Sequence, residues 1–390
     1  MEMIKQFFDK IRPNFEEGGK LHAFRSVFEG METFMLVPNT TSKVGVSIHD
    51  AIDSKRIMSF VVIALIPALL FGMYNIGYQN AAAAGKLAET GFWSMFLYGF
   101  LLVLPKIVVS YVVGLGIEFA VAQWKKEEIQ EGYLVSGILI PLIVPVNCPL
   151  WMLALAVAFS VIICKEIFGG TGMNIFNPAL IARAFLFFSY PTSMSGDKVW
   201  VAGKEVFGLG YNLPDAATMA TPLGEVGAGL QPTASLSDMI VGLIPGSIGE
   251  TSVIAIAIGA LILLYTQIAS IRTMTSVFVG GVLVAVLFNM AGMEGNAVAN
   301  MPWYEHIVTG GFCFGAVFMA TDPVTSSRTE KGQYVYGFLI GALAILIRVL
   351  NPGYPEGMML AILFMNMFAP LIDYCVIQRN INKRMKRVQK

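Results

Sequence analysis

Apolar segments long enough to form membrane helices alternate with polar connections along the chain. A hydrocarbon core about 30 Å thick takes roughly 20 residues of helix to cross. The pattern predicts ten spans, some of them short: 57–78, 95–122, 133–147, 150–168, 175–189, 252–268, 275–291, 307–320, 336–350 and 358–376. Prolines and the Gly169–Gly172 run interrupt the third to fifth, so we expect broken or re-entrant helices that line a cavity. The fold class is therefore all-α, integral to a membrane.

The polar connections divide the chain into five expected parts. They are a polar N-terminal segment at 1–55, a five-helix half at 56–189, a long loop at 190–251, a second five-helix half at 252–376 and a basic tail at 377–390.

Basic residues predict which side each part faces. Lysine and arginine are frequent before residue 57 and after residue 376, and scarce in the loop at 190–251, which has only Lys198 and Lys204. Because cytoplasmic loops carry the excess of positive charge, we expect both termini in the cytoplasm and this loop outside.

Composition supports the membrane assignment. Of 390 residues, 56% are hydrophobic and 13% are charged, against about a quarter charged in soluble domains. A nucleic-acid-binding protein and a cytosolic dinucleotide enzyme are excluded on this ground. The four cysteines show no C-x-x-C spacing, which argues against a self-contained iron–sulfur or zinc site.

The two halves contain similar sequences. The hexapeptide at 173–178 resembles that at 365–370, and a glycine followed eight residues later by a proline recurs at Gly137 and Gly315. With five spans in each half, a repeat would be inverted, and such repeats commonly bind a ligand or ion between them. Chance similarity between apolar segments is the alternative.

A short motif stands in the long loop. Asp215, Thr218 and Thr221 fit the pattern D-x-x-[S/T]-x-A-T. From the residues alone, Thr221 is a helix N-cap with Pro222 at the first helical position. The motif also resembles the sequence that periplasmic flavin transferases modify, which implies FMN joined by a phosphoester to the Thr221 hydroxyl.

Stretches along the whole chain resemble the NqrB family of bacterial sodium-translocating NADH:quinone oxidoreductases. The matching stretches are Phe15–Lys20, Lys55–Met58, Gly72–Asn75, Lys165–Gly172, Phe176–Leu180, Ile244–Glu250, Met319–Pro323 and Asn351–Met359. The related Rnf complex has a homologous membrane protein without the polar extension, so residues 1–55 favour the sodium-pumping family.

This resemblance implies a fold similar to urea and ammonium transporters, with two inverted five-helix repeats. It implies covalent FMN on Thr221, with Asp215 and Thr218 as motif residues, and a non-covalent riboflavin near Asn174 and Asn177. Electrons would pass from FMN to riboflavin to ubiquinone, coupled to Na+ export across the bacterial inner membrane. The partners would be the other components of the complex, named A, C, D, E and F, and a periplasmic flavin transferase for maturation. On the residues alone, both asparagines could simply stabilise a broken helix.

Two acidic residues match family positions that are implicated in sodium uptake or quinone reactions. They are Glu118, late in the second span, and Asp373, near the end of the last span; oxygen ligands suit a hard cation. The alternative for Glu118 is an interfacial carboxylate paired with Lys125 or Lys126. For Asp373 it is a helix-end charge near Arg379.

Gly114 lies in the region that the resemblance assigns to quinone, although Leu115 departs from a family pattern of two adjacent glycines. A helix-packing role is the alternative for Gly114. Lys165 and Arg183 are interpreted as topology charges on the cytoplasmic side, with contact to an anion or a cofactor as the alternative. Two rival functions remain: an Rnf-type membrane component that serves ferredoxin and NAD, and a small-solute channel, which would need no flavin motif.

Overall fold

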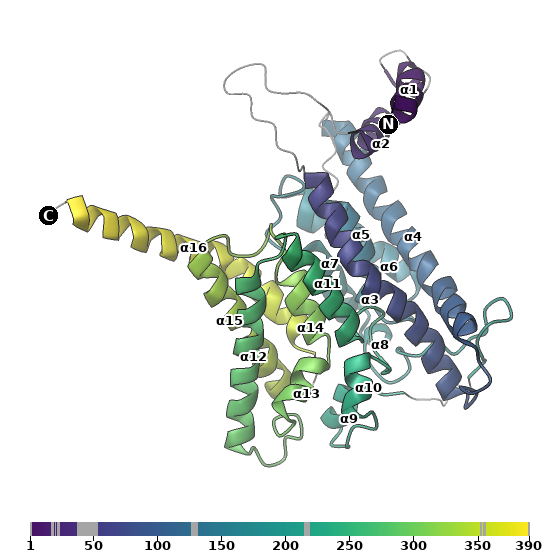
Figure 1. Ribbon diagram of the computed structural model, residues 1–390, viewed down its shortest axis with the longest axis vertical. Coiled ribbons are helices and arrows are strands. Elements are labelled where there is room, and N and C mark those ends of the chain that lie inside the picture. Colours follow the sequence, from purple (N-terminus) through teal and green to yellow (C-terminus); the bar gives the residue numbers. More distant parts are fainter. Residues whose placement is uncertain are drawn as a thin grey trace.

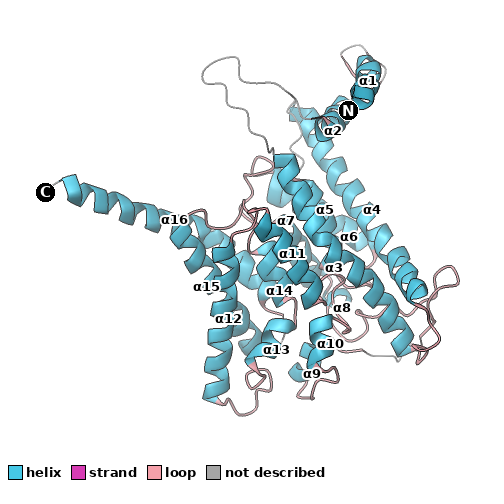
Figure 2. Ribbon diagram, viewed as in Figure 1, coloured by secondary structure: helices cyan, strands magenta, loops and turns pink. Residues whose placement is uncertain are grey.

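The computed structural model describes residues 2–16, 19, 21, 24–36, 54–125, 132–213, 219–351, 353 and 356–388. Regular structure in these residues is helical, apart from one isolated bridge between Val206 and Leu209 (Figure 2). Figure 1 shows a bundle of long helices with two short N-terminal helices at one end.

The helices before residue 190 follow the predicted pattern closely. They are α1 Glu2–Ile11, a 3-10 turn Arg12–Asn14, α2 Arg25–Met35, α3 Ser54–Ala83, α4 Phe92–Lys125, α5 Tyr133–Leu142, α6 Leu150–Phe159 with its π-helical continuation Ser160–Glu166, and α7 Pro178–Ser189.

The later helices begin with short ones in the long loop. They are α8 Pro191–Met194, α9 Pro222–Gly227, α10 Leu236–Val241, α11 Val253–Tyr265, α12 Ile271–Ala291, α13 Trp303–Val308, α14 Phe312–Phe314 with its π-helical continuation Gly315–Met319, α15 Glu330–Leu350 and α16 Met358–Val388.

Five of these helices are long and apolar enough to cross a membrane: α3, α4, α12, α15 and α16. Three further apolar helices, α5, α7 and α11, are shorter. The prediction of an all-helical membrane protein is confirmed in so far as these helices are long and apolar enough to cross a membrane. Each of the ten predicted segments contains helix.

Among the predicted segments whose bounds differ in the structure, three show a clear backbone cause. The third ends at Leu142, before Pro145, which has no N–H to continue a helix. The fifth begins only at Pro178, after its N-cap. The eighth is broken between α13 and α14, where Gly310 and Gly311 adopt positive φ values of 62° and 66°, a conformation that glycine adopts at little cost.

One face of α4 is directed into the bundle. Lys106, Ser110, Gly114 and Glu118 are all buried and recur at every fourth residue, so they lie on the same side of the helix. Lys106 donates to the carbonyl of Cys148 at 2.7 Å, which satisfies backbone freed by the break between α5 and α6. One face of α4 therefore carries polar and charged side chains into the interior of the bundle.

Candidate functional site

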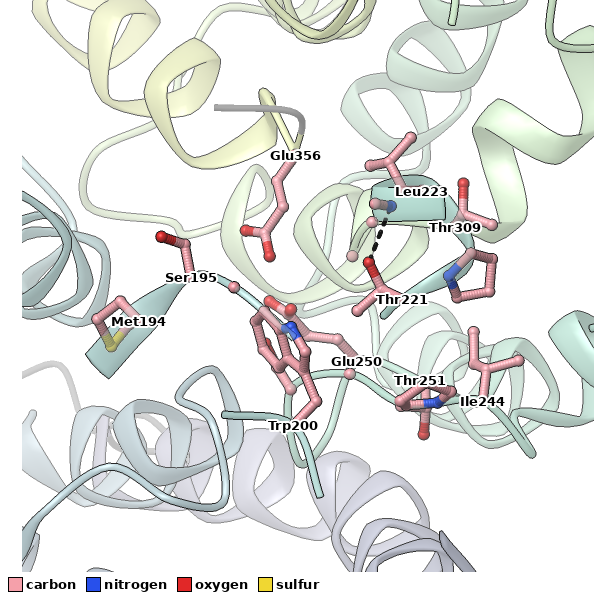
Figure 3. A pocket seen from close by; sticks show the side chains of 18 of the residues that line it. Met194, Ser195, Trp200, Thr221, Leu223, Ile244, Glu250, Thr251, Thr309 and Glu356 are labelled. Atoms are coloured by element: carbon pink, nitrogen blue, oxygen red, sulfur yellow. Dashed lines mark hydrogen bonds between the residues drawn. The ribbon is translucent and has the colours of Figure 1, made fainter. Parts of the chain in front are cut away.

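A cavity of about 920 Å³, including its opening, lies where the long loop meets α7 and α13. We name it the Thr221 cavity. Residues that supply its polar and aromatic groups are Arg183, Trp200, Thr221, Glu250, Thr309 and Glu356. Figure 3 shows the Trp200 ring between Thr221 and Ser195, with Glu356 pointing toward the same space. Its walls come from four separate parts of the chain.

Thr221 is the N-cap of α9. Its Oγ1 accepts a hydrogen bond of 3.1 Å from the backbone N–H of Gly224, and Pro222 takes the first helical position. The capping interpretation is therefore confirmed, and the same residue also lines the cavity. Because the cap uses an oxygen lone pair, the hydroxyl hydrogen is not consumed, and the oxygen can keep its N–H contact after esterification.

A buried ion-pair cluster forms one wall of the Thr221 cavity. Arg183 donates to Glu250 at 2.5 Å and also pairs with Glu356, while its Nη2 lies 3.4 Å from Ser247 Oγ. Burial raises the pKa of the Glu250 carboxyl to about 7, with Arg183 acting in the opposite direction. One guanidinium lies between two carboxylates in this wall. Because water screens these charges little, a change in the charge of any one of them strongly affects the other two.

A second cavity, of about 780 Å³, lies at the other end of α7, and we name it the Asn177 cavity. Its apolar walls include Leu139, Leu263 and Phe318 from three helices. Its polar lining is contributed chiefly by Ser136, Lys165, Thr171, Asn174, Asn177, Thr321 and Asp322. A mostly apolar enclosure with a few polar groups is typical of cofactor sites.

The two asparagines have partners within this wall. Asn177 caps α7 by accepting from Ala179 N at 3.0 Å, and its amide donates to Asp322 at 3.2 Å. Asn174 donates to the carbonyl of Phe176 at 2.9 Å. Burial raises the pKa of the Asp322 carboxyl, which also accepts from the Val324 N–H and the Thr325 hydroxyl. Both asparagines therefore stabilise the broken backbone and line the cavity at once.

Glu118 pairs with Lys165, which lines the Asn177 cavity. The alternative pairing with Lys125 is wrong, because Lys125 lies 3.7 Å from Glu166 instead; Lys126 lies outside the described residues. Lys165 and Arg183 are 4% and 5% exposed, so their interpretation as topology charges is also wrong. Each is a buried partner of a carboxylate.

Asp373 lies on α16 and holds the start of α15. Its carboxylate accepts from Ser327 Oγ at 2.6 Å, from Arg328 N at 2.8 Å, and from Thr329 N and Oγ1 at 3.0 and 2.6 Å. Asp373 lies inside α16, fifteen residues before its last residue, so the interpretation as a helix-end charge is wrong. Its four hydrogen bonds give it a clear positioning role.

Gly114 allows close contact between α4 and α5. A Cβ at this position would lie 2.0 Å from Cζ of the Tyr133 ring, whereas one at Gly116 would meet nothing within 4 Å. The packing role is confirmed, and it fixes the helix that carries Ser136 and Leu139 into the Asn177 cavity.

Some site residues are not described and others were missed. Asp215 and Thr218 lie outside the described residues. Trp200, Glu250 and Glu356 were not anticipated, since each looks like an ordinary loop residue. The sequence did contain one sign of buried acidic partners: Arg183 is a cation in the middle of the apolar run of α7.

Segments of the chain connect the two cavities. α7 begins at the Asn177 cavity and carries Arg183 and Phe187 to the Thr221 cavity. At 1.5 Å per residue, these two side chains lie roughly 9 and 15 Å along the axis from Asn177. α11 also runs between the two cavities, in the opposite direction. Thr251, just before this helix, lines the Thr221 cavity, and Leu263, near its end, lines the Asn177 cavity.

Comparison with known proteins agrees with this architecture. The pattern of the NQR2, RnfD, RnfE family matches residues 41–382. The NqrB subunit of the Na(+)-translocating NADH-quinone reductase of Chromohalobacter salexigens is 45% identical over 98% of this chain and 96% of its own length. The corresponding proteins of Pseudoalteromonas atlantica and Neisseria meningitidis are 44% and 42% identical, over 99% and 98% of this chain and 99% of their own lengths. The chain therefore belongs to the NQR2, RnfD, RnfE family, as the NqrB subunit of a Na+-translocating NADH-quinone reductase.

Proposed function

We propose that this protein carries electrons between two flavins, FMN esterified to Thr221 and a non-covalent riboflavin in the Asn177 cavity, and delivers them to ubiquinone. When bound, the flavins supply the redox chemistry that side chains lack. The observation that carries the proposal is the placement of the Thr221 hydroxyl on the wall of a cavity that also presents an arginine and an indole.

The residues of the Thr221 cavity suit a flavin phosphoester. Arg183 provides a cation, and Trp200 provides a flat apolar surface against which a planar ring system can stack. The capping contact from Gly224 orients the threonine oxygen. These groups would hold and orient the ring, while the ester bond would prevent its loss from a cavity with loop walls.

The Asn177 cavity suits a cofactor held without a covalent bond. The amides of Asn174 and Asn177 can donate to and accept from a polar ring edge, and Thr171 and Thr321 offer hydroxyls for a ribityl chain. Helices supply about half of its lining residues. The short spacing along α7 supports direct transfer between the two sites.

Packing supports the inverted repeat of the transporter-like fold. The first helices of the two halves, α3 and α11, pack together, as do the last ones, α7 and α16. In each half the second helix packs on the fourth, as α4 on α6 and α12 on α15. α3 begins at the Asn177 cavity whereas α11 ends there, so the members of this pair run in opposite directions, as inversion requires.

Charge placement supports an inner-membrane orientation with both termini cytoplasmic. The described basic residues of α16 follow its apolar part, and Lys55 and Arg56 precede that of α3. The Thr221 cavity would then open to the periplasm, where a flavin transferase acts. The components named A, C, D, E and F would complete the electron path and the Na+ route.

For sodium and quinone, we propose Asp373 and Glu118 as pathway residues and the Gly114 region as the quinone approach. Asp373 offers a carboxylate at the junction of α15 and α16, and Glu118 is a buried carboxylate that pairs with Lys165 of the Asn177 cavity. Intramembrane carboxylates commonly mark ion pathways. Asp373→Asn keeps one acceptor oxygen for the loop but removes the charge, and it should weaken the sodium dependence of quinone reduction; an unchanged sodium response excludes Asp373.

The test of the flavin assignment uses the assembled complex. Its chains are separated under denaturing conditions, viewed under ultraviolet light, and the peptide that contains Thr221 is weighed by mass spectrometry. Thr221→Val should abolish the fluorescent band and the FMN mass, while Thr221→Ser and Thr218→Val should keep them.

A matched control addresses the loss of the helix cap. Ser235 caps α10, another six-residue helix of the same loop, so Ser235→Ala should remove a cap and leave the flavin in place. Flavin that persists in Thr221→Val would contradict the assignment, because it would then be attached at another residue. Absence of covalent flavin from the unmutated chain would favour the solute channel. Reduction of NAD by ferredoxin, in place of quinone reduction, would favour the Rnf-type activity.

A further inference from the structure

The last helix is longer than a membrane crossing requires. α16 has 31 residues, about 46 Å of helix, against a hydrocarbon core of about 30 Å. Figure 1 shows its C-terminal part leaving the bundle and running sideways, across the direction of α12 and α15. We name residues 374–387 the basic extension.

The basic extension is strongly cationic. It carries five basic side chains, at Arg379, Lys383, Arg384, Lys386 and Arg387, and no acidic one follows Asp373. None of the five forms an ion pair within the part of the chain that the structure describes. Their charge is therefore available to a partner.

The same helix carries an apolar stripe. Tyr374, Ile377, Ile381 and Met385 recur at intervals of three or four residues and are 43–62% exposed. Such spacing places them on one face of the helix. The five basic side chains lie beside this stripe or on the opposite face.

We propose that the basic extension lies on the membrane surface and binds anionic phospholipid headgroups, with its apolar stripe inserted among the acyl chains. A cationic amphipathic helix of this kind settles at the boundary between headgroups and hydrocarbon. Anionic lipids supply the matching charge, and several lysines and arginines near the surface act together.

The geometry favours lipid over a protein partner. The extension continues α16, whose apolar part is a candidate membrane span, and its sideways course away from the bundle suits a position along the membrane surface. Its apolar residues form a single narrow stripe, which suits shallow insertion. The proposal depends neither on the flavins nor on which side of the membrane this end faces.

The experiment uses the complete complex in lipid nanodiscs. Met385 is replaced by the photo-crosslinking residue p-benzoylphenylalanine, and Asn380, an exposed residue off the stripe, is replaced in the same way as the matched control. After illumination, mass spectrometry identifies what is attached. Discs of phosphatidylglycerol with phosphatidylcholine are compared with discs of phosphatidylcholine alone.

Position 385 should yield phospholipid adducts in the anionic discs, several-fold more than position 380. These adducts should fall several-fold in phosphatidylcholine discs and when all five basic residues are changed to glutamine. An adduct with another protein of the complex at position 385 would overturn the proposal, as would equal yields at the two positions or yields independent of lipid charge.

Discussion

The two cavities differ in what builds their walls. The Thr221 cavity is lined largely by loop residues, by a six-residue helix and by a charged cluster, whereas the Asn177 cavity takes about half of its lining from helices and has Lys165 and Asp322 among its polar groups. A wall of loops holds a ligand less firmly than a wall of packed helices, because loops open at lower free-energy cost. The contrast explains why a covalent bond suits the first site and non-covalent binding suits the second.

The largest expected effect concerns the charged wall of the Thr221 cavity. Arg183→Gln leaves Glu250 and Glu356 without the cation that they share, and breaking a buried ion pair costs about 3–5 kcal/mol. We expect a markedly lower thermal midpoint for the assembled complex, measured by the loss of this chain from it on heating.

The control for this prediction is Arg272→Gln. Arg272 pairs with Glu330 on the surface, where the two side chains are 39% and 76% exposed, and such pairs contribute about 0–1 kcal/mol. Equal thermal midpoints for the two variants would show that the buried cluster does not stabilise the cavity.

The next effect concerns the helix wall of the Asn177 cavity. Gly114→Ala forces a methyl group against the Tyr133 ring, and overpacking of this kind costs about 1–3 kcal/mol. Since α5 forms part of that wall, we expect less non-covalent flavin in acid extracts and unchanged covalent flavin. Gly116→Ala has free space and should change neither; loss of both flavins in Gly114→Ala would contradict the separation of the two sites.

A smaller and more selective effect should follow from Asn177→Ser. Serine keeps an N-cap oxygen for α7 but removes the amide that donates to Asp322. We expect a several-fold loss of non-covalent flavin with little change in the thermal midpoint. Asn289→Ser, which removes an amide that binds the carbonyls of Ala299 and Met301, should retain the flavin. Full retention in Asn177→Ser would mean that Asn177 only caps the helix.

The smallest effect is a pH dependence at the Thr221 cavity. Because burial raises the pKa of Glu250 to about 7, the carboxyl is negative above this pH and neutral below it. Reduction adds negative charge, so the midpoint potential of the covalent flavin should rise more steeply as the pH falls through 7. Glu250→Gln should remove this extra slope, while Glu205→Gln, in an exposed loop, should keep it. A slope unchanged in Glu250→Gln would exclude this carboxyl as its source.

The membrane fold could be predicted from the sequence because the length of each apolar segment is set directly by the thickness of the hydrocarbon that the helix must cross. Sequence reasoning also placed Thr221, Asn174 and Asn177, since motifs and broken helices are local features of a sequence. It missed Glu250 and Glu356 because their importance comes from Arg183, far away along the chain. A buried partner is visible only after folding brings both charges together.

The π-helical turns, at Ser160–Glu166 and Gly315–Met319, also escaped prediction, because no residue pattern marks an extra residue per turn. The same reason explains why the bounds of the broken spans were inexact. A proline or glycine signals that a helix is interrupted, but packing decides where the interruption falls.

The rigidity of α7 has a consequence for how this protein can vary. Since one uninterrupted helix joins the two cavities, their separation depends on residue count and not on loop conformation. Inserting or deleting a single residue between Pro178 and Arg183 would turn every later side chain by about 100° relative to the start of the helix and remove Arg183 from its carboxylates. Length changes between homologues should therefore gather in the loop at 190–251 and spare this helix.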